Sequence, residues 1–548
     1  MTLLAQSASG SVVPDVAWSL LAPLLVIALG GILLITVTSV APALKERGFP
    51  AGFTILTAVI AGVFLRSLWT RVSDDGPQSI VGDALTIDHY AIFVWGVICV
   101  SVLLVAALLD GYLRRENLDG PEWYVLILMS ASGGMILAAA QDLILGFLGL
   151  EILSIAVYVL AALHLRRSES QEAAFKYFVL GALSSALFLY GIALVYGATG
   201  STNLAGIAAA RSDNAAGLNP LEDSSMMLVG MALVLVGFGF KVSAVPFHMW
   251  TPDVYQGSPT PVVAFMASAV KVAGFAGFVR VFWDGFGYYE ADWRPLIIAL
   301  SAASLLVGSF LALAQTNVKR MLAYSSIAHA GFMLAAVQSI GVDNAVDSLR
   351  GAEALLFYMA AYSVVVAGTF GVMTLVGGRG DGEHTLDDYA GLSRSQPLLA
   401  ALMAVLLFAQ AGIPFTSGFM AKFRVIYATA ASGSYVLAGV AMLSAVVAAV
   451  LYLRVIASMF LAGEPEVAHA ASDTDTDDDE TDADGEAADG ADDDDAAPVH
   501  VRTTEVELFR PAMAAIMISA VVTIVLGVFP GVGGDVLRSA AESLINLK

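Results

Sequence analysis

Long apolar runs recur along the whole chain, and they restrict its fold more than any other feature does. An α-helix of about 20 apolar residues crosses the ~30 Å hydrocarbon core of a bilayer. The chain of 548 residues is 58% hydrophobic and only 14% charged, which is typical of a multi-spanning membrane protein. We therefore predict an all-α polytopic membrane protein with about fourteen transmembrane helices. The expected spans lie near residues 17–38, 50–68, 88–110, 122–140, 141–163, 173–197, 225–247, 260–283, 294–314, 320–341, 352–377, 397–428 (interrupted), 432–462 and 510–530.

Lys and Arg residues in the short loops predict the orientation, because loops rich in them stay on the cytoplasmic side. Odd-numbered loops carry more of these residues than even-numbered loops do. The odd set includes the pairs Arg166 with Arg167 and Lys319 with Arg320, whereas Arg280 is assigned to an even loop. The bias predicts that odd loops are cytoplasmic and that both termini lie outside.

One segment concentrates the negative charge of the chain. Between Glu464 and Asp495 the sequence carries sixteen acidic residues and no Lys or Arg, so it accounts for most of the formal net charge of −22. Such a segment cannot bury apolar surface, and we expect residues 463–505 to form a disordered acidic loop. Loop parity places this loop in the cytoplasm. The spacing of its acids does not support a cation-binding or partner-docking role.

Residues that could hold a redox cofactor or a metal are scarce. Cys99 is the only cysteine and lies inside a span, so disulfides, iron–sulfur clusters and cysteine-rich zinc sites are excluded by ligand count. The sequence contains neither a dinucleotide-binding glycine motif after a strand nor a phosphate-binding loop. We expect no cofactor, no metal and no nucleic-acid partner for this chain.

Ionisable residues inside the apolar runs are the strongest functional signal. Four of the seven lysines (Lys176, Lys241, Lys271 and Lys422) fall inside or at the edge of predicted spans, and Glu151 lies inside another. Each ionisable group in mid-membrane costs ~2.5–3.5 kcal/mol on the insertion scale, so these side chains are expected to face the protein interior. Ion pairs that tie helices together are one explanation. Four lysines cannot all pair with one deep carboxylate, however, so some are expected to be neutral part of the time.

Groups that alternate between charged and neutral forms are suited to carrying protons. Loss of water disfavours the charged form of a buried amine, and a nearby carboxylate favours it again. A lysine whose glutamate partner moves away can therefore release its proton. His248 and His329 suit positions between such lysines, because imidazole gives and accepts protons near neutrality. For each histidine alone, a hydrogen-bonded core residue is an equally good explanation.

Two prolines interrupt predicted spans beside a buried lysine. Pro246 lies five residues after Lys241, and Pro414 lies eight residues before Lys422. Proline leaves backbone groups without partners, which at membrane depth is tolerated only where the chain lines protein or a water-filled cavity. Broken helices at corresponding positions of two halves are typical of transporters with internal repeats. Two incidental kinks are the weaker explanation, since both breaks coincide with a buried lysine.

Two stretches carry a specific resemblance to a known family. "KVSAVPFHMWTPDVYQGSPTPVVAFMASAVKVAGF" and "TNVKRMLAYSSIAHAGFML" resemble the signatures of the antiporter-like family of proton-translocating membrane subunits. That family includes three large subunits of respiratory complex I (NADH:quinone oxidoreductase) and the Mrp-type cation/proton antiporters. The resemblance extends from about the third span to the thirteenth. Within the family, "EAAFKYFVLGALSSALFLYG", "HMWTPDVY" and "SAVKVAGF" are most similar to the N-type subunit.

The resemblance implies two inverted five-helix repeats, each containing a broken helix. These would occupy residues 122–283 and 294–462. Three N-terminal spans would fill residues 1–121, and the last span and the C-terminus would fill residues 506–548.

The resemblance also implies roles for matching residues. Glu151 and Lys241 resemble the paired carboxylate and lysine of the first half-channel, so we expect their side chains within ~4–6 Å of each other or bridged by water. The remaining matches are a central relay lysine, a terminal station and two polar positions on the hydrated axis, namely Lys271, Lys422, His329 and Lys176. A polar row in the membrane plane, from Lys241 past Lys271 to Lys422, is therefore expected.

The family implies that this chain is a proton-translocating membrane-arm subunit of a bacterial complex I, located in the inner (plasma) membrane. Other subunits of the enzyme would hold NADH, FMN, iron–sulfur clusters and quinone, and quinone reduction there would drive proton movement here. The expected neighbours are a K-type small subunit, an M-type antiporter-like subunit and the lipid bilayer. Other functions stay open. The same scaffold would serve a stand-alone or Mrp-type Na⁺/H⁺ antiporter or a subunit of a related hydrogenase or ferredoxin-linked complex, and a purely structural bridge is the alternative from a different class. An antiporter would bind Na⁺ through carboxylates, and only Glu151 lies deep.

Overall fold

Helices with roughly aligned axes make up almost the entire molecule. The structure, a computed structural model, describes residues 17–45, 48–118, 120–215, 224–340, 344–382, 384–461 and 509–545. Within these ranges, thirteen helices are long and apolar enough to cross a membrane. The prediction of an all-α polytopic membrane fold is therefore confirmed. The acidic segment between Glu464 and Asp495 lies outside the described residues, so its expected disorder stays a prediction.

The membrane helices follow the predicted runs closely. The thirteen are α1 (Ala22–Val40), α2 (Phe49–Asp75), α3 (His89–Glu116), α4 (Glu122–Ala139), α5 (Leu143–Ala162), α6 (Ser168–Thr199), α8 (Ser224–Val242), a composite helix over 260–285, α12 (Glu290–Leu313), α13 (Val318–Ile340), α14 (Ala345–Val376), α18 (Tyr435–Leu461) and α19 (Arg510–Val528). The composite helix consists of α10 (Thr260–Phe265), the π-helical turn η2 (Met266–Val270), α11 (Lys271–Arg280) and a second π-helical turn η3 (Val281–Gly285). The remaining predicted span, 397–428, consists of two shorter helices, α16 (Pro397–Ala411) and α17 (Ser417–Ala431).

Short elements occupy the connections, and the apolar pattern did not predict them. An antiparallel hairpin, β1 (Gln78–Ile80) with β2 (Leu85–Ile87), joins α2 to α3 and pairs Ser79 with Thr86. The other short elements are η1 (Pro42–Leu44), α7 (Leu204–Ala215), α9 (Trp250–Gly257), η4 (Gly287–Tyr289), η5 (Asp387–Tyr389), α15 (Leu392–Ser395) and α20 (Gly534–Ile545).

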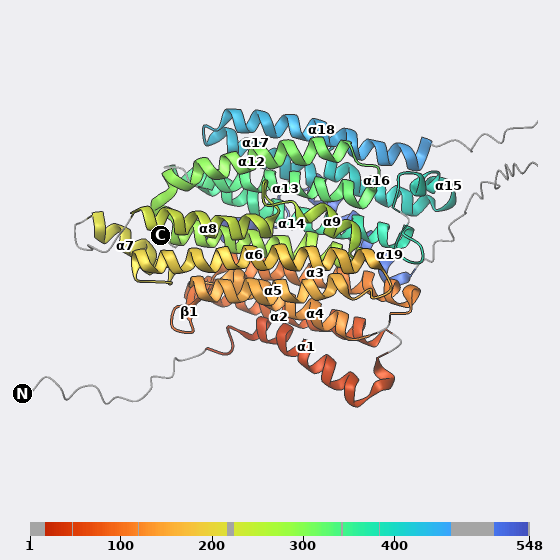
Figure 1. Ribbon diagram of the computed structural model, residues 1–548, viewed down its shortest axis with the longest axis horizontal. Helices are drawn as coiled ribbons and strands as arrows, with labels where there is room; N and C mark the ends of the chain where they lie inside the picture. Colours follow the sequence, from red (N-terminus) through yellow and green to blue (C-terminus); the bar gives the residue numbers. More distant parts are fainter. Residues whose placement is uncertain are drawn as a thin grey trace, which may run out of the picture.

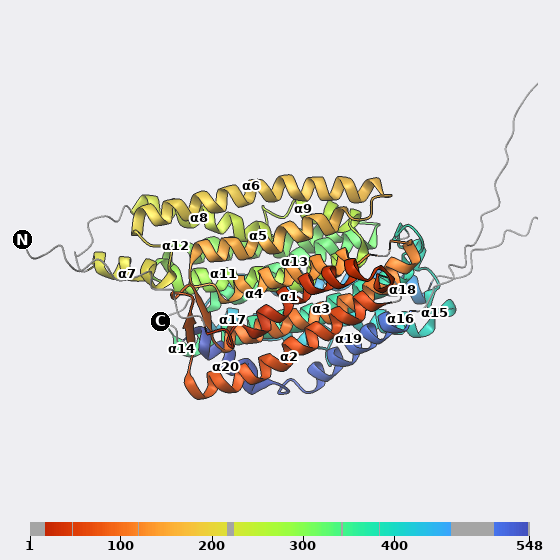
Figure 2. The ribbon, with the colours of Figure 1, turned by 90° about the horizontal axis from the view of Figure 1, so that it is seen from below.

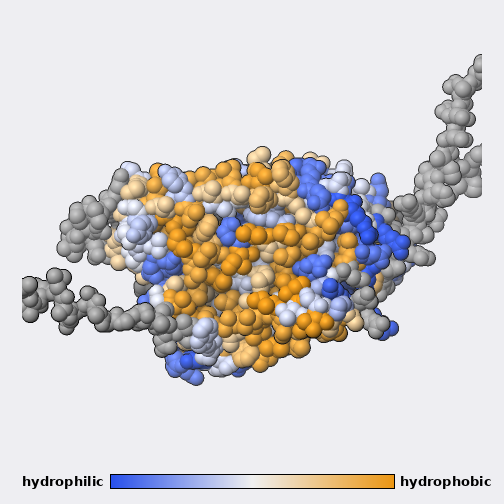
Figure 3. Space-filling model, turned by 60° about the horizontal axis from the view of Figure 1, so that its bottom comes forward, coloured by the Kyte–Doolittle hydropathy of each residue, from blue (hydrophilic) through white to orange (hydrophobic). Residues whose placement is uncertain are grey.

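The helices lie side by side, with the central ones shielded from the surface. In Figure 1, α1 lies at the bottom, α18 at the top, and α13 and α14 between them. The composite helix 260–285, α13 and α14 are buried along most of their length, whereas α1, α6 and α18 expose much of theirs. Figure 2 shows the same parallel packing from below. In Figure 3 an apolar band covers the middle of the surface and polar residues gather towards the two ends, as a bilayer requires.

Both predicted breaks are present, and the two helix ends are built alike. Helix α8 ends at Val242, where Ser243 takes a left-handed backbone conformation (φ 63°). The amide of Ser243 bonds the carbonyl of Phe240, and the next amide bonds the carbonyl of Gly239. Helix α16 ends in the same hydrogen-bond pattern, a Schellman motif around a left-handed Gly412 (φ 90°).

One loop assignment made from the sequence is wrong. Arg280 was counted in an even loop, but it lies in α11 and is fully buried. Its guanidinium pairs with Asp88, the N-cap residue of α3, through two contacts of 2.7 and 3.0 Å. The paired carboxylate explains how an arginine fits inside an apolar span. Arg280 therefore lies inside a membrane helix and not in a loop.

Candidate functional site

Three lysines from three different helices lie deep inside the molecule. Lys241, near the end of α8, is 3% exposed, Lys271, the first residue of α11, is 2% exposed, and Lys422 of α17 is 5% exposed. Within the described residues, their nitrogens contact hydroxyl and carbonyl oxygens and make no ion pair with a carboxylate. We call Lys241, Lys271 and Lys422 the lysine row.

Lys241 is surrounded by hydroxyl groups and aromatic rings. Its Nζ donates to Ser154 Oγ of α5 at 2.8 Å. The rings of Tyr158 and Tyr177 lie 5.9 and 5.8 Å from the same nitrogen, within the range of cation–π attraction. The side-chain stem packs on Gly274 of α11, where an added Cβ would lie 3.3 Å from Lys241 Cγ. Lys241 therefore lies beside the helix that carries Lys271.

Glu151 lies close to Lys241 on α5 without pairing with it directly. It precedes Ser154 by one helical turn and accepts a hydrogen bond from Ser185 of α6. Ser154, Ser185 and Lys241 together line a small cavity of about 10 Å³, which is roughly enough for one water molecule. The Glu151 charge also acts on Lys241 electrostatically. The expected separation of ~4–6 Å, or a bridging water, stays a prediction.

Lys271 follows a local irregularity of its helix. The π-helical turn η2 (Met266–Val270) ends immediately before it, and such turns inside α-helices are frequent at functional sites. Lys271 Nζ donates to the carbonyl oxygen of Ser326 at 2.8 Å and to its hydroxyl oxygen at 2.5 Å. Tyr362 of α14 donates to the same hydroxyl at 2.9 Å. Ser326 therefore connects Lys271 to α13 and α14.

His329 lies one helical turn beyond Ser326 and is held at both ring nitrogens. Nδ1 contacts Tyr358 Oη at 2.6 Å, and Nε2 contacts Tyr452 Oη of α18 at 3.2 Å. The charges of both Lys271 and Lys422 act on the ring. His329 thus lies between the second and third lysines of the row.

Lys422 caps the broken helix α16. Its Nζ donates to the carbonyl oxygens of Gln410 and Ala411 at 2.7 and 3.0 Å. These are the last carbonyls of α16 that the Schellman bonds leave free, and they form the negative end of the helix dipole. The break therefore creates the polar site that the lysine occupies. Gln410 and His329 both line a small cavity of about 10 Å³.

The structure does not bring Lys176 and His248 into this row. Lys176 of α6 is half-exposed and pairs with Glu172 at 2.7 Å and with Asp253 at 2.9 Å. It lines a polar pocket of about 410 Å³ near the 166–168 and 381–384 loops. His248 lies in the turn after α8, and its Nδ1 is buried without a hydrogen-bond partner among the described residues.

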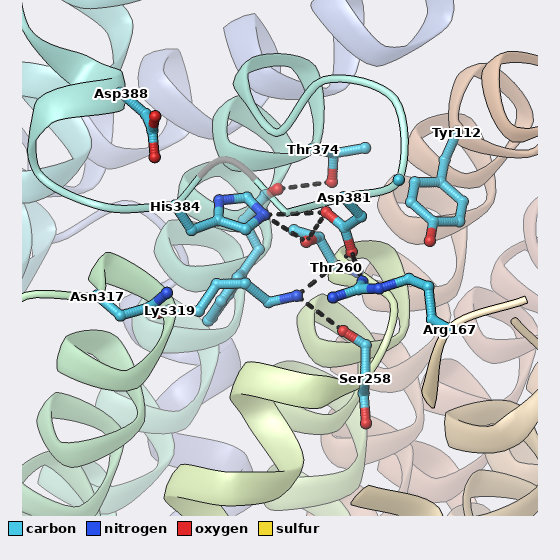
Figure 4. A network of polar contacts seen from close by, with 12 residues as sticks. Tyr112, Arg167, Ser258, Thr260, Asn317, Lys319, Thr374, Asp381, His384 and Asp388 are labelled. Carbon is cyan, nitrogen blue, oxygen red and sulfur yellow. Dashed lines mark hydrogen bonds and ion pairs between the residues drawn. The ribbon is translucent and has the colours of Figure 1, made fainter. Parts of the chain in front are cut away.

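A second group of buried charges was missed at the sequence level. Asp381, in the loop after α14, is fully buried and accepts from Arg167 at 3.2 Å and from Lys319 at 3.3 Å. Its carboxylate also accepts from His384 Nε2 at 3.0 Å and from the hydroxyl and amide of Thr260 at 2.6 and 2.9 Å. Figure 4 shows these side chains converging on Asp381. We call Asp381, Arg167, Lys319, His384 and Thr260 the Asp381 cluster.

The Asp381 cluster is electrostatically compensated. Burial by itself would raise the pKa of Asp381, but Lys319, the hydrogen bond from His384 and Arg167 together hold that pKa well below its ordinary value. Burial lowers the pKa of His384 although Asp381 opposes this, so the histidine is neutral near pH 7. Asp381 is therefore a permanent anion that holds two cations.

The cluster also fixes helices of the lysine row. Thr260 begins α10, which continues into Lys271, and Lys319 lies at the start of α13, which carries Ser326 and His329. Only the run of like charges "RR" and the glycine-rich "GGRGDGEH" hint at this arrangement in the sequence, and neither shows which residues meet. No group of three or more His, Cys, Asp or Glu side chains that could hold a metal occurs within the described ranges.

Comparison with known proteins adds an independent line of evidence. Residues 140–448 match the family model described as "NADH:quinone oxidoreductase/Mrp antiporter, TM". The chain is 41% identical over 446 residues to NADH-quinone oxidoreductase subunit N of Trichlorobacter lovleyi, which covers 81% of this chain and 88% of the relative. It is also 41% identical over 455 residues to subunit N of Chloroflexus aggregans, covering 83% and 90% of the two chains.

Solved structures give the same picture. A chain of respiratory complex I from Thermus thermophilus superimposes with a TM-score of 0.71 at 30% identity, covering 94% of this chain and 99% of that one. A chain of an archaeal membrane-bound sulfane sulfur reductase gives a TM-score of 0.77 at 25% identity, covering 96% and 98%. A chain of the Mrp complex from Dietzia gives 0.73 at 23% identity over 97% and 96%, a likeness of fold alone.

Proposed function

Since the chain belongs to the NADH:quinone oxidoreductase/Mrp antiporter transmembrane family, we propose that it is the proton-translocating N subunit of NADH-quinone oxidoreductase. One observation carries the proposal from the structure. Three buried lysines donate hydrogen bonds to uncharged oxygen atoms. Hydroxyl and imidazole groups lie between two of them, Lys271 and Lys422. A row of this kind holds groups that can gain and lose protons, which a purely structural bridge does not need.

The lysine row is the proposed path of the proton. Between Lys271 and Lys422 the path runs over Ser326 and His329, whose partners Tyr362, Tyr358 and Tyr452 can donate and accept hydrogen bonds. Between Lys241 and Lys271 the contact is through Gly274, one helical turn from Lys271, and a water molecule would complete the step.

Glu151 tunes the first lysine in this proposal. A carboxylate near a lysine favours its charged form, so movement of Glu151 away from Lys241 would promote release of the proton. We assign His248, in the turn after α8, and Lys176, beside Tyr177 on α6, to the Lys241 end of the path, where they are partly exposed and outside the row. The chain supplies no redox centre in this scheme. NADH, FMN, the iron–sulfur clusters and the quinone belong to other subunits, whose electron transfer drives the movement.

The setting of the subunit follows from the same proposal. Its neighbours in the membrane arm are a K-type small subunit and an M-type antiporter-like subunit, and the assembly lies in a bacterial inner membrane. The loop charges favour an orientation with both termini outside. The matching Schellman ends of α8 and α16 support two inverted repeats over 122–283 and 294–462.

Two rival functions make different demands on the residues. A Na⁺/H⁺ antiporter binds Na⁺ through carboxylate and carbonyl oxygens, whereas the lysine row presents cations along its length. A structural bridge needs its buried charges only for assembly. The structural bridge therefore predicts that a lysine can be replaced by arginine, which keeps the charge.

Substitution of Lys241 tests the proposal. Lys241→Ala is expected to leave the complex assembled in the membrane and to lower proton-coupled quinone reduction sharply. Lys241→Arg is expected not to restore the activity, because arginine does not release its proton at physiological pH. Lys45→Ala, at an exposed loop lysine, is the control and is expected to behave like the unmodified chain. Normal activity of assembled Lys241→Ala complex would remove this lysine from the path.

A further inference from the structure

An apolar groove opens on the membrane-facing side, away from both charged sites. It lies between α2, α3, α14, α19 and α20, and its volume is about 930 Å³. Helices α2 and α19 both pack against α3, and Figure 2 shows the three running alongside one another. Among the described residues that line the groove, Arg66 is the only one with a charged side chain.

Two glycines leave the bottom of the groove uncovered. A Cβ added at Gly62 of α2 would meet no atom within 4 Å, and one added at Gly96 of α3 would meet only Leu65 Cδ1 at 4.0 Å. The space therefore comes from missing side chains on two facing helices. A slender apolar occupant can lie directly against the helix backbones.

The length of the groove matches one leaflet of a bilayer. The lining residues run from Ala58 to Trp69 on α2 and from Ile92 to Leu104 on α3. At 1.5 Å per residue these stretches measure roughly 17–18 Å, a little over half of the ~30 Å hydrocarbon core. A lipid acyl chain occupies this depth, whereas a transmembrane helix of a neighbour would cross the whole core.

The end of the groove nearest the β1–β2 hairpin carries a free cation. Arg66 is exposed and makes no ion pair or hydrogen bond with any described residue. Trp69 lies one turn further along α2, with its ring 4.4 Å from that of His89. Both residues lie near the end of the apolar run at 50–68, and tryptophan and arginine at such ends are typical of the headgroup region. Guanidinium groups also bind phosphate well.

We propose that this groove is a phospholipid-binding site. The acyl chains lie along Gly62 and Gly96, and the headgroup phosphate pairs with Arg66. The apolar lining, the half-bilayer length and the unpaired cation at one end match a single phospholipid in the leaflet on the hairpin side. None of the residues that line the groove belongs to the lysine row or to the proposed proton path.

Cryo-electron microscopy of the assembled complex in nanodiscs of dioleoylphosphatidylglycerol tests the proposal. The expected result is an elongated lipid density along Gly62 and Gly96 with its headgroup at Arg66. In the Gly62→Leu variant the added side chain fills open space, so the complex is expected to assemble and the density to disappear. Gly52→Leu on the same helix also meets no atom within 4 Å but lies outside the groove, so its lipid density is expected to persist.

Substitution of the cation separates the headgroup from the chains. Arg66→Gln is expected to weaken retention of the phospholipid during delipidation by on the order of tenfold, through loss of one charge-assisted contact. A protein helix seated in the groove would overturn the proposal. Unchanged lipid density in Gly62→Leu, or unchanged retention in Arg66→Gln, would also contradict it.

Discussion

The lysine row and the Asp381 cluster both bury cations, but they surround them with different partners. In the cluster, Lys319 and Arg167 share one buried carboxylate. In the row, Lys271 and Lys422 donate only to hydroxyl and carbonyl oxygens. Lys241 donates a hydrogen bond to a hydroxyl oxygen, and the Glu151 carboxylate acts on it without forming an ion pair.

This difference separates cations that hold structure from cations that can change charge. A buried cation on a carboxylate is costly to disturb, because loss of either partner leaves an uncompensated charge. A lysine amine that donates to uncharged oxygen atoms can keep its hydrogen bonds in both its charged and its neutral form. The same residue type therefore serves as an anchor in one region and as a proton carrier in the other.

The largest expected effect comes from removing the anion of the cluster. Asp381→Asn keeps the side-chain shape but leaves Lys319 and Arg167 without their carboxylate, which is expected to destabilise the fold by about 3–5 kcal/mol. The amount of assembled complex in the membrane measures it. Combining Asp381→Asn with Lys319→Met removes one cation as well and is expected to recover part of the loss. Equal assembly of single and double variants would show that charge compensation is not the reason.

Within the lysine row, removal of one hydroxyl group is expected to cause a smaller loss, a decrease in the rate of turnover. Tyr362→Phe removes the hydrogen bond to Ser326 that shares its oxygen with Lys271. A net loss of about 0.5–1.5 kcal/mol corresponds to a decrease in the rate of proton-coupled turnover of up to ~tenfold. Assembly is expected to be normal. Tyr190→Phe, at an exposed tyrosine, is the control, and equal turnover of the two variants would exclude the Ser326 link.

Lowering the pH is expected to decrease the stability of the Asp381 cluster, because His384 becomes protonated. Because burial lowers the pKa of this histidine in the fold, the unfolded chain binds more protons as pH falls below about 6.5. The stability contributed by the neutral ring is therefore present above that pH and is lost below it. Asp381, whose pKa is also lowered, adds a further loss only below about pH 4.

His384→Gln keeps a donor for Asp381 but cannot titrate in this window. The variant is expected to lose less thermal stability than the unmodified complex when the pH is changed from 7 to 5. Identical pH dependence of the two unfolding temperatures would show that His384 is not the titrating group.

The smallest effect is expected from deletion of acidic residues that belong neither to the lysine row nor to the Asp381 cluster. Deletion of Ser472 to Asp495 removes much of the acidic segment, which cannot bury apolar surface. Assembly and proton pumping are expected to stay close to normal. A collapse of activity after this deletion would assign a docking role to the segment.

The spans and the breaks could be predicted because each is encoded locally. Apolar runs of helical length specify the membrane helices, and Pro246 and Pro414 mark the two interruptions. The buried lysines stand out for the same reason, since a charge inside an apolar run has few structural explanations.

The partners of these charges could not be predicted, because they meet only after folding. Asp381 lies more than 200 residues from Arg167, and nothing local distinguishes it from other loop acids. Arg280 was misassigned for a related reason, since its partner Asp88 precedes a distant helix. Serine and tyrosine side chains such as Ser326 and Tyr452 are common in apolar spans and carry no signal of their own.

A paired arginine substitution tests the contrast between the two regions most directly. Proton pumping by assembled complexes carrying Lys271→Arg or Lys319→Arg is the measurement. Arginine keeps the charge but does not release a proton, so Lys271→Arg is expected to abolish pumping. Lys319→Arg preserves the ion pair with Asp381 and is expected to retain most of the pumping. Normal pumping by Lys271→Arg, or equal loss in both variants, would contradict the assignment of the row as carrier and the cluster as anchor.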